Sequence, residues 1–201
     1  MNIVQTIRLL LLGIVAVCVL ARAVGHIDGP KIVQSQDNRV EITLPRGWRT
    51  TTLPGASERY IQATCPVKNA FVEVISEAKQ DLQHKSLLSY ARSIATRQAA
   101  NSKLSDRIVS KPREPWFNGT KAIQFEIRGT LKNVNFVYLD TFIETPTCWN
   151  QILCWTTPSY WEGARDGDFR AIIESLKEND RQSFGQVQKA PAAQTLSREQ
   201  R

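Results

Sequence analysis

Alternating apolar and polar residues predict most of the strands in this chain. Residues 40–44 read Val-Glu-Ile-Thr-Leu and are followed by Pro45 and Gly47. This is the pattern of a half-buried strand that ends in a turn. Comparable alternation or short apolar runs predict further strands over residues 58–65, 70–75, 123–127, 133–144 and 151–156.

Turn-forming residues separate these strands. Pro66 and Asn69 lie between residues 58–65 and 70–75, so those two strands are predicted to form a hairpin. Asn118-Gly119 predicts a tight turn, because both residues tolerate a positive φ. Gly129 is predicted to end the strand that begins near Ile123. Trp48 follows the first turn, and we expect it to close the core over the sheet.

Two segments show helical spacing instead. Ser86 can cap a helix whose apolar face is formed by Leu87, Tyr90, Ala91 and Ile94 and which fades near residue 101. Near the C-terminus, a second helix is predicted from apolar residues at i, i+3, i+4 and i+7, with Asp166 or Asp168 as its cap. The residues of this second stripe are Phe169, Ile172, Ile173 and Leu176.

The order of these elements predicts the fold class. Neighbouring strands with one helix between them and one after them indicate an α+β domain, an antiparallel sheet flanked by helices. We expect a single domain over residues 39–178 and a polar lead-in over residues 24–38. Residues 179–201 have no apolar periodicity and are predicted to be a disordered tail.

The N-terminus predicts export. Arg8 precedes the apolar run 9–20, and the run is followed by Ala21-Arg22-Ala23, which matches a secretory signal cleaved after Ala23. A permanent anchor is less favoured, because a spanning helix needs about 20 apolar residues. A lipoprotein acylated on Cys18 is a third possibility, although Val17 is larger than lipoprotein processing prefers. The mature protein is thus expected to be periplasmic or secreted, without a stable membrane anchor.

Charge excludes one class of partner. The formal charge is +7, and it becomes +5 once Arg8 and Arg22 leave with residues 1–23, which contain no acidic residue. The remaining basic residues are spread along the chain, whereas a nucleic-acid surface usually shows a clustered basic stripe. We therefore expect no nucleic-acid partner. Contact with an anionic membrane surface or cell-wall polymer remains open.

Three cysteines remain after cleavage, and an oxidising compartment favours pairing two of them. Cys148 and Cys154 are the first choice, because they are expected to surround a hairpin turn. A bond from Cys65 to either one is the alternative.

No residue constellation predicts catalysis or metal binding. The only histidines are His26 and His84, and there is no Cys-x-x-Cys motif. Asp166-Gly167-Asp168 lacks the further acidic positions of a calcium loop, so a turn and helix cap explain it better. Glu73 and Glu77 show no spacing that indicates a hydrolase. We expect no catalytic residue, no metal and no cofactor.

An aromatic cluster is the one unusual local feature. Trp149, Trp155, Tyr160 and Trp161 fall within thirteen residues of the chain. Packing in the core at the end of the sheet is the simpler interpretation. The alternative is an exposed aromatic ledge, and these four residues would then be the candidates for binding a partner or stacking on sugar rings.

Four segments in this order resemble the PsbP-like family, which includes periplasmic proteins of the DcrB type. They are residues 42–48 (Ile-Thr-Leu-Pro-Arg-Gly-Trp), the helix start 86–91, the Asn118-Gly119 hairpin and the closing helix 168–176. The resemblance spans about residues 31–177. It implies a central antiparallel sheet between helices, an α/β/α sandwich, and no shared catalytic residues.

Members of that family act as photosystem assembly factors, envelope proteins and Eag-type chaperones of type VI secretion effectors. This chain differs from the DcrB type in lacking a convincing lipoprotein motif, and from the Eag-type chaperones in carrying an export signal. Three hypotheses follow. The first is a non-enzymatic accessory protein of the bacterial envelope that recognises a protein partner. The others are a small-molecule or glycan binder with an aromatic pocket, and a cell-wall hydrolase.

Overall fold

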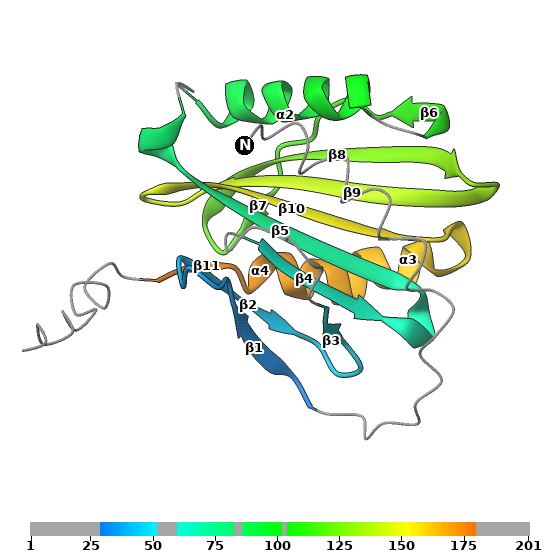
Figure 1. The fold of residues 1–201 in the computed structure, drawn as a ribbon, viewed down its shortest axis with the longest axis horizontal. Coiled ribbons are helices and arrows are strands. Elements are labelled where there is room, and N and C mark those ends of the chain that lie inside the picture. The colour runs from blue at the N-terminus through cyan, green and yellow to red at the C-terminus, as the bar shows by residue number, and fades with distance from the viewer. Residues whose placement is uncertain (1–28, 52–59, 83–85, 102–103, 180–201) are drawn as a thin grey trace, which may run out of the picture.

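The computed structural model describes residues 29–51, 60–82, 86–101 and 104–179. Figure 1 shows a large twisted sheet with α2 along one side, and with a smaller sheet and a second helical segment on the other side. The strands are β1 (Lys31–Gln34), β2 (Val40–Leu44), β3 (Arg49–Thr50), β4 (Tyr60–Cys65), β5 (Ala70–Ala78), β6 (Ser105–Val109), β7 (Trp116–Phe117), β8 (Thr120–Leu131), β9 (Val134–Glu144), β10 (Cys148–Thr156) and β11 (Lys177–Glu178).

The helices are α2 (Leu87–Asn101), α3 (Trp161–Gly163) and α4 (Arg170–Glu174), and a π-helical turn, η5 (Ala164–Phe169), joins the last two. Short 3₁₀ turns are η2 (Pro66–Lys68), η3 (Lys79–Asp81) and η4 (Pro158–Tyr160). The large sheet has eight strands in the order β3-β4-β5-β10-β9-β8-β6, with β7 also paired to β8, and the small sheet has the order β1-β2-β11. The described strand pairs are antiparallel, so the predicted α+β class is confirmed.

Alternation along the strands divides the core into two clusters. Val72 and Val74 of β5 and Ile152 and Cys154 of β10 face the α3–α4 segment and the small sheet, where they pack with Phe169 and other apolar residues. The opposite face packs under α2, through Tyr90, Ala91 and Ile94 against residues of β8, β9 and β10. The sheet is therefore the middle of three layers.

The hairpin and helix-start predictions are confirmed. Asn118 and Gly119 have φ values of +47° and +78°, and they join β7 to β8 as a tight turn. Ser86 accepts a hydrogen bond from the backbone N–H of Ser89 at 3.2 Å, while the Ser86 N–H donates to Ser89 Oγ. These reciprocal bonds satisfy free donors at the start of α2.

Three local predictions are wrong. Lys31–Gln34, which lies in the expected lead-in, forms β1 and pairs with β2. The polar residues around it give no alternating pattern from which the strand could be predicted. β8 continues through Gly129, where a Cβ would lie 3.1 Å from Leu104 Cβ and 3.2 Å from the Ser105 carbonyl oxygen. Asp166 and Asp168 lie inside η5 and cap no helix.

Asp168 instead ties the last helical segment to the rest of the fold. Its Oδ2 accepts hydrogen bonds from Trp48 Nε1 and from Lys68 Nζ, both at 2.8 Å. Trp48 is buried in the core, as expected. None of the helices in the described ranges is both long enough and apolar enough to cross a membrane.

Candidate functional site

Strand register places two carboxyl groups in one line across the large sheet. Gln62 on β4 lies opposite Glu73 on β5, Glu73 lies opposite Leu153 on β10, and Leu153 lies opposite Asp140 on β9. Neighbouring residues on these strands point into the core on the other face, so this line lies on the face that carries α2. We call Gln62, Glu73, Leu153 and Asp140 the carboxylate row.

Each carboxyl in this row is buried beside an amide. Asp140 is 0% exposed and accepts a hydrogen bond from Gln151 Nε2 at 2.8 Å. Glu73 is 6% exposed and accepts one from Gln62 Nε2 at 3.3 Å. Among the described residues, Asp140 Oδ2 and Gln62 Oε1 have no hydrogen-bond partner. An ionised carboxylate has no proton to donate, so these buried oxygen atoms stay without a hydrogen bond while Glu73 and Asp140 are ionised.

Burial changes the protonation of both groups. Desolvation raises the pKa of Glu73 to about 7, against a smaller lowering by the Gln62 hydrogen bond. Desolvation also raises the pKa of Asp140 to about 7; Gln151 and the charge of Arg107 oppose this change, and the charge of Glu73 adds to it. Near neutral pH both groups are thus partly protonated.

An aromatic row lies beside the carboxylate row. Phe71 and Tyr138 are the cross-strand neighbours of Trp155 on its two sides. The Trp155 ring stacks on Phe71 with centroids 5.2 Å apart and on Tyr138 with centroids 6.1 Å apart. Both faces of the Trp155 ring are therefore occupied. Phe71 and Tyr138 are half-buried, as is Leu153.

The cluster beneath α2 borders these rows but does not extend to the other side of the sheet. It is built from β8, β9 and Trp149 of β10, and it includes no described residue of β4 or β5. Tyr90 of α2 stacks on Trp149, with centroids 5.7 Å apart, and its hydroxyl donates to Glu77 at 2.9 Å. Half-buried apolar side chains thus continue past the α2 cluster onto β4 and β5.

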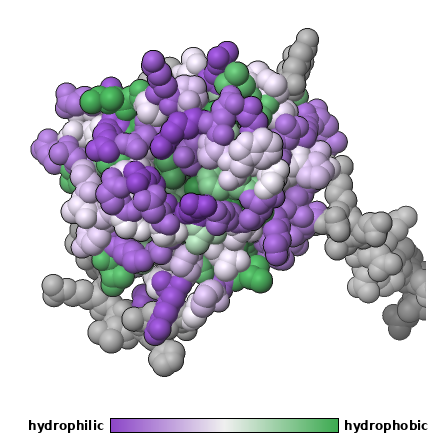
Figure 2. Space-filling model, turned by 180° about the vertical axis from the view of Figure 1, so that it is seen from behind, coloured by the Kyte–Doolittle hydropathy of each residue, from purple (hydrophilic) through white to green (hydrophobic). Residues whose placement is uncertain are grey.

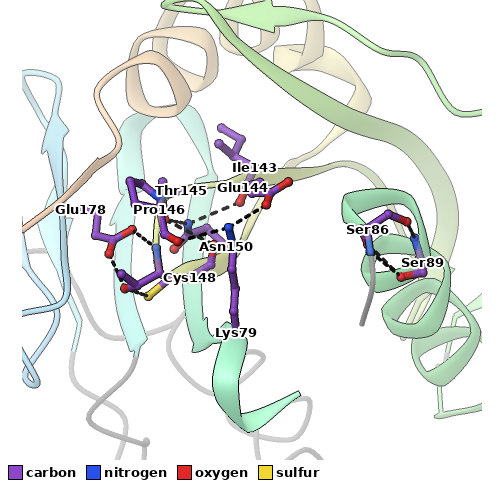
Figure 3. Close-up of polar contacts among 11 residues, drawn as sticks. Lys79, Ser86, Ser89, Ile143, Glu144, Thr145, Pro146, Cys148, Asn150 and Glu178 are labelled. Carbon is purple, nitrogen blue, oxygen red and sulfur yellow. Dashed lines mark hydrogen bonds and ion pairs between the residues drawn. The ribbon is translucent and has the colours of Figure 1, made fainter. Parts of the chain in front are cut away.

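The β9–β10 turn anchors one end of this face (Figure 3). Lys79 Nζ pairs with Glu144 at 2.6 Å and donates to the Pro146 carbonyl at 3.3 Å, and it lies 5.0 Å from the centre of the Trp149 ring. Asn150 Nδ2 donates to Thr145 Oγ1 at 2.9 Å. Thr147 donates through its backbone N–H and its hydroxyl to Glu178 of β11, which links the two sheets.

The chemistry of the site is acid–amide pairing. Among the described residues, no donor reaches Gln62 Oε1. A protonated Glu73 can donate its O–H to this oxygen while it accepts from Gln62 Nε2, so the neutral acid and the amide can form two hydrogen bonds. Metal binding has no support here, because the described residues contain no group of three or more histidine, cysteine or acidic side chains placed to hold an ion. Two carboxyls with raised pKa values meet one requirement of a hydrolase, but Asp140 is out of contact with solvent.

The exposed aromatic ledge is absent. Trp149 and Trp155 lie against the large sheet as described, and Trp161 is buried in the core 6.4 Å from the Phe169 ring centre. The simpler interpretation, packing in the core, is therefore confirmed for Trp149, Trp155 and Trp161, and the alternative of an exposed ledge is wrong for these three. Of the four candidates only Tyr160, which is 47% exposed, is on the surface.

The predicted Cys148–Cys154 disulfide is also wrong. Both residues lie on β10, not around a turn. Six residues of extended strand separate their Cα atoms by about 20 Å, whereas a disulfide needs less than about 7 Å. Cys65, Cys148 and Cys154 are all free and buried, and burial raises the pKa of the Cys65 and Cys154 thiols.

Sequence reasoning missed the carboxylate row. Glu73 was considered only with Glu77, which points to the end of the face near Tyr90. The available signal was the period-2 pattern: Glu73 lies between Phe71 and Ile75 on one strand face, and Asp140 follows Phe136 and Tyr138 and precedes Phe142 on another. An acid among aromatic residues on one face predicts a buried carboxyl. The predicted cleavage after Ala23, Cys18 and both histidines lie outside the described residues.

Comparisons with known proteins identify the fold. No protein-family model matches the sequence, and no curated protein matches it. The solution structure of cyanobacterial PsbP (CyanoP) from Synechocystis is similar, with a TM-score of 0.58 and 13% sequence identity over 80% of this chain and 99% of that one. The Ran-binding protein Mog1p from Saccharomyces cerevisiae is similar with a TM-score of 0.50 and 8% identity, over 76% of this chain and 96% of that one. With its antiparallel sheet between helical layers, this chain has the PsbP-like fold.

Proposed function

We propose that this chain is a non-enzymatic accessory protein of the bacterial cell envelope that binds a protein partner. The binding surface in this proposal is the part of the α2-bearing face that lies on β4, β5 and β10. The envelope location rests on the export signal predicted from residues 1–23.

The observation that carries this proposal is the half-buried apolar surface beyond the α2 cluster. Its members, Tyr60, Phe71, Ile75 and Leu153, come from the three adjacent strands β4, β5 and β10 and lie beside the buried carboxyls. Aromatic and apolar side chains form the centre of protein interfaces, and a rim of polar groups surrounds them. A protein segment laid across these strands would bury the apolar residues completely.

The fold itself is compatible with such a role. Mog1p, which has this fold, is named as a Ran-binding protein, so the same arrangement of sheet and helices occurs in a protein that binds another protein. CyanoP is named as a PsbP protein. Neither similarity identifies the partner of this chain.

Two other functions have less support from the geometry. A glycan binder needs a free aromatic face for the sugar ring, but Phe71 and Tyr138 cover both faces of Trp155. A hydrolase needs carboxyls that reach a substrate, but Asp140 is 0% exposed. Replacing Glu73 by Gln would abolish turnover in a hydrolase that used it, whereas the proposed binding role predicts a folded protein that keeps its partner.

A photo-crosslinking residue at position 153 tests the proposal. In envelope extracts we expect a crosslinked species that forms at Leu153 but not at Tyr160, which is exposed elsewhere on the surface. The Leu153→Lys variant should lose the same partner while its thermal unfolding temperature stays within a few degrees. Identical products from positions 153 and 160, or retention of the partner by Leu153→Lys, would remove this face as the binding surface.

A further inference from the structure

The outer edge of β8 carries an unusual set of exposed apolar side chains. The segment 105–117, from β6 to β7, runs along this edge. It includes Ile108, 67% exposed, Val109, 44% exposed, and Trp116, 64% exposed. Figure 2 shows the molecule from behind, with apolar colour in separate patches among hydrophilic residues.

Basic residues lie near these apolar side chains. Lys121 is the cross-strand neighbour of Trp116, and Arg128 is that of Ile108. Lys121 pairs with Glu114, and Arg128 with Glu126. The structure records no ion pair among the described residues for Lys111, Arg113 or Lys132, all of which are exposed. This edge therefore has an excess of positive charge next to its apolar side chains.

The same edge is poorly suited to pairing with another strand. The register with β8 shifts between Ser105 and Ile108, and Asp106 has a φ of +52°, which is a bulge of the kind that blocks strand addition. Pro112 and Pro115 follow, and neither has a backbone N–H to donate. A partner that extends the sheet would find an irregular edge, so exposed apolar residues here need a different occupant.

We propose that this edge docks on an anionic lipid surface. Tryptophan favours the boundary between headgroups and acyl chains, and lysine and arginine interact with lipid phosphates. Lipid headgroups require no regular row of backbone donors, so the bulge and the prolines do not oppose this contact. The edge lies on β6, β7 and β8, away from the β4, β5 and β10 surface proposed for the protein partner, and the two proposals can fail independently.

Tryptophan fluorescence tests this docking at a single residue. Trp116 is exposed, whereas Trp48, Trp149, Trp155 and Trp161 are each at most 6% exposed, so acrylamide quenches mainly Trp116. Vesicles of phosphatidylglycerol and phosphatidylethanolamine should shield it from acrylamide and shift its emission to shorter wavelength. Neutral phosphatidylcholine vesicles should not, and the Trp116→Phe variant should lose the response.

Charge variants separate lipid docking from other causes of shielding. Lys111→Gln with Arg113→Gln should weaken binding to anionic vesicles roughly 25-fold, since each basic residue near the surface contributes about fivefold. Arg46→Gln with Arg49→Gln removes the same charge from exposed positions near β3 and should leave binding within twofold. Equal weakening by both double variants, equal shielding by neutral vesicles, or an unshielded Trp116 on anionic vesicles would each overturn the proposal. If only the N-terminal segment inserted into the vesicles, Trp116 would remain unshielded.

Discussion

The two faces of the large sheet are built from the same strands but differ in what they bury. The face beneath the α3–α4 segment and the small sheet buries mainly apolar side chains, with Phe169, Ile172 and Trp161 packed over Val72, Ile152 and Cys154. The polar side chains that it buries, such as Ser76 and Asn150, are uncharged. The α2-bearing face buries Glu73, Asp140 and Gln151 next to aromatic rings. Both faces pack as cores, and the α2-bearing face also buries the carboxyl groups of Glu73 and Asp140.

This difference shows how stability and binding can be divided between two sides of one sheet. An apolar core stabilises by removing area from water, and its contribution depends little on pH. Buried carboxyls are unfavourable when ionised, and proteins retain them at a cost in stability. The buried carboxyls of the α2-bearing face therefore lower the free energy of unfolding at neutral pH. Such a loss of stability is expected where a surface is retained for function.

The largest expected effect lies on the apolar face. Phe169→Ala removes a fully buried ring that contacts Trp48 and Trp161, with ring centres 6.2 and 6.4 Å away. The free energy of unfolding should fall by about 4 kcal/mol, from lost transfer energy and the cavity left behind. Urea unfolding at pH 5 and pH 8 should show the same loss. A loss that changed with pH would mean that the two faces are coupled.

The next effect distinguishes the α2-bearing face by its pH dependence. Glu73 and Asp140 have pKa values near 7 in the folded state, against ordinary values of 4.5 and 3.8. Because the folded state holds these protons more tightly, stability should be highest below about pH 4. The contribution of these two groups should decline by at most about 8 kcal/mol up to about pH 7 and then level off.

Glu73→Gln tests this assignment. A glutamine cannot ionise, and its amide can pair with Gln62 through two hydrogen bonds. The variant should be more stable than the wild type at pH 8 by about 3 kcal/mol, with a shallower decline between pH 4 and pH 7. Urea unfolding across this range measures both. An unchanged slope would show that folding does not raise the pKa of Glu73.

Asp168→Ala tests a charged link at the margin of the apolar face. It leaves the buried Trp48 Nε1–H without its acceptor and Lys68 without its partner. The expected loss is about 2 kcal/mol in urea unfolding at pH 7. Asp168→Asn retains an oxygen for Trp48 and should lose less. Equal losses in the two variants would assign the effect to the ion pair with Lys68.

The smallest effect concerns how α2 is attached. Tyr90→Phe keeps the ring that stacks on Trp149 and removes the hydroxyl that donates to Glu77 at 2.9 Å. Stability should fall by about 1 kcal/mol. Hydrogen exchange of α2 amides should accelerate more than exchange in β10. Uniform acceleration across both elements would instead indicate global loss of stability.

The sequence by itself determined the elements whose patterns are local. Alternation in residues 40–44 and 133–144 predicted β2 and most of β9, and Asn118-Gly119 predicted the β7–β8 turn. Ser86 predicted the start of α2, because a cap acts within one turn of its own residue. Short polar strands such as β1 and β6 were missed, since their pairing, not their composition, holds them in place.

Only the tertiary structure decided which residues meet across the sheet. Gln62, Glu73, Leu153 and Asp140 come from four strands separated by up to 91 positions of sequence, and register alone aligns them. β10 extends through both Cys148 and Cys154 and so keeps them apart, and packing buries Trp149, Trp155 and Trp161. Burial depends on which layer covers a face of the sheet. The sequence pattern of a strand does not tell which other segment will pack against it. The protonation of Glu73 and Asp140, and with it the candidate site, therefore followed from packing.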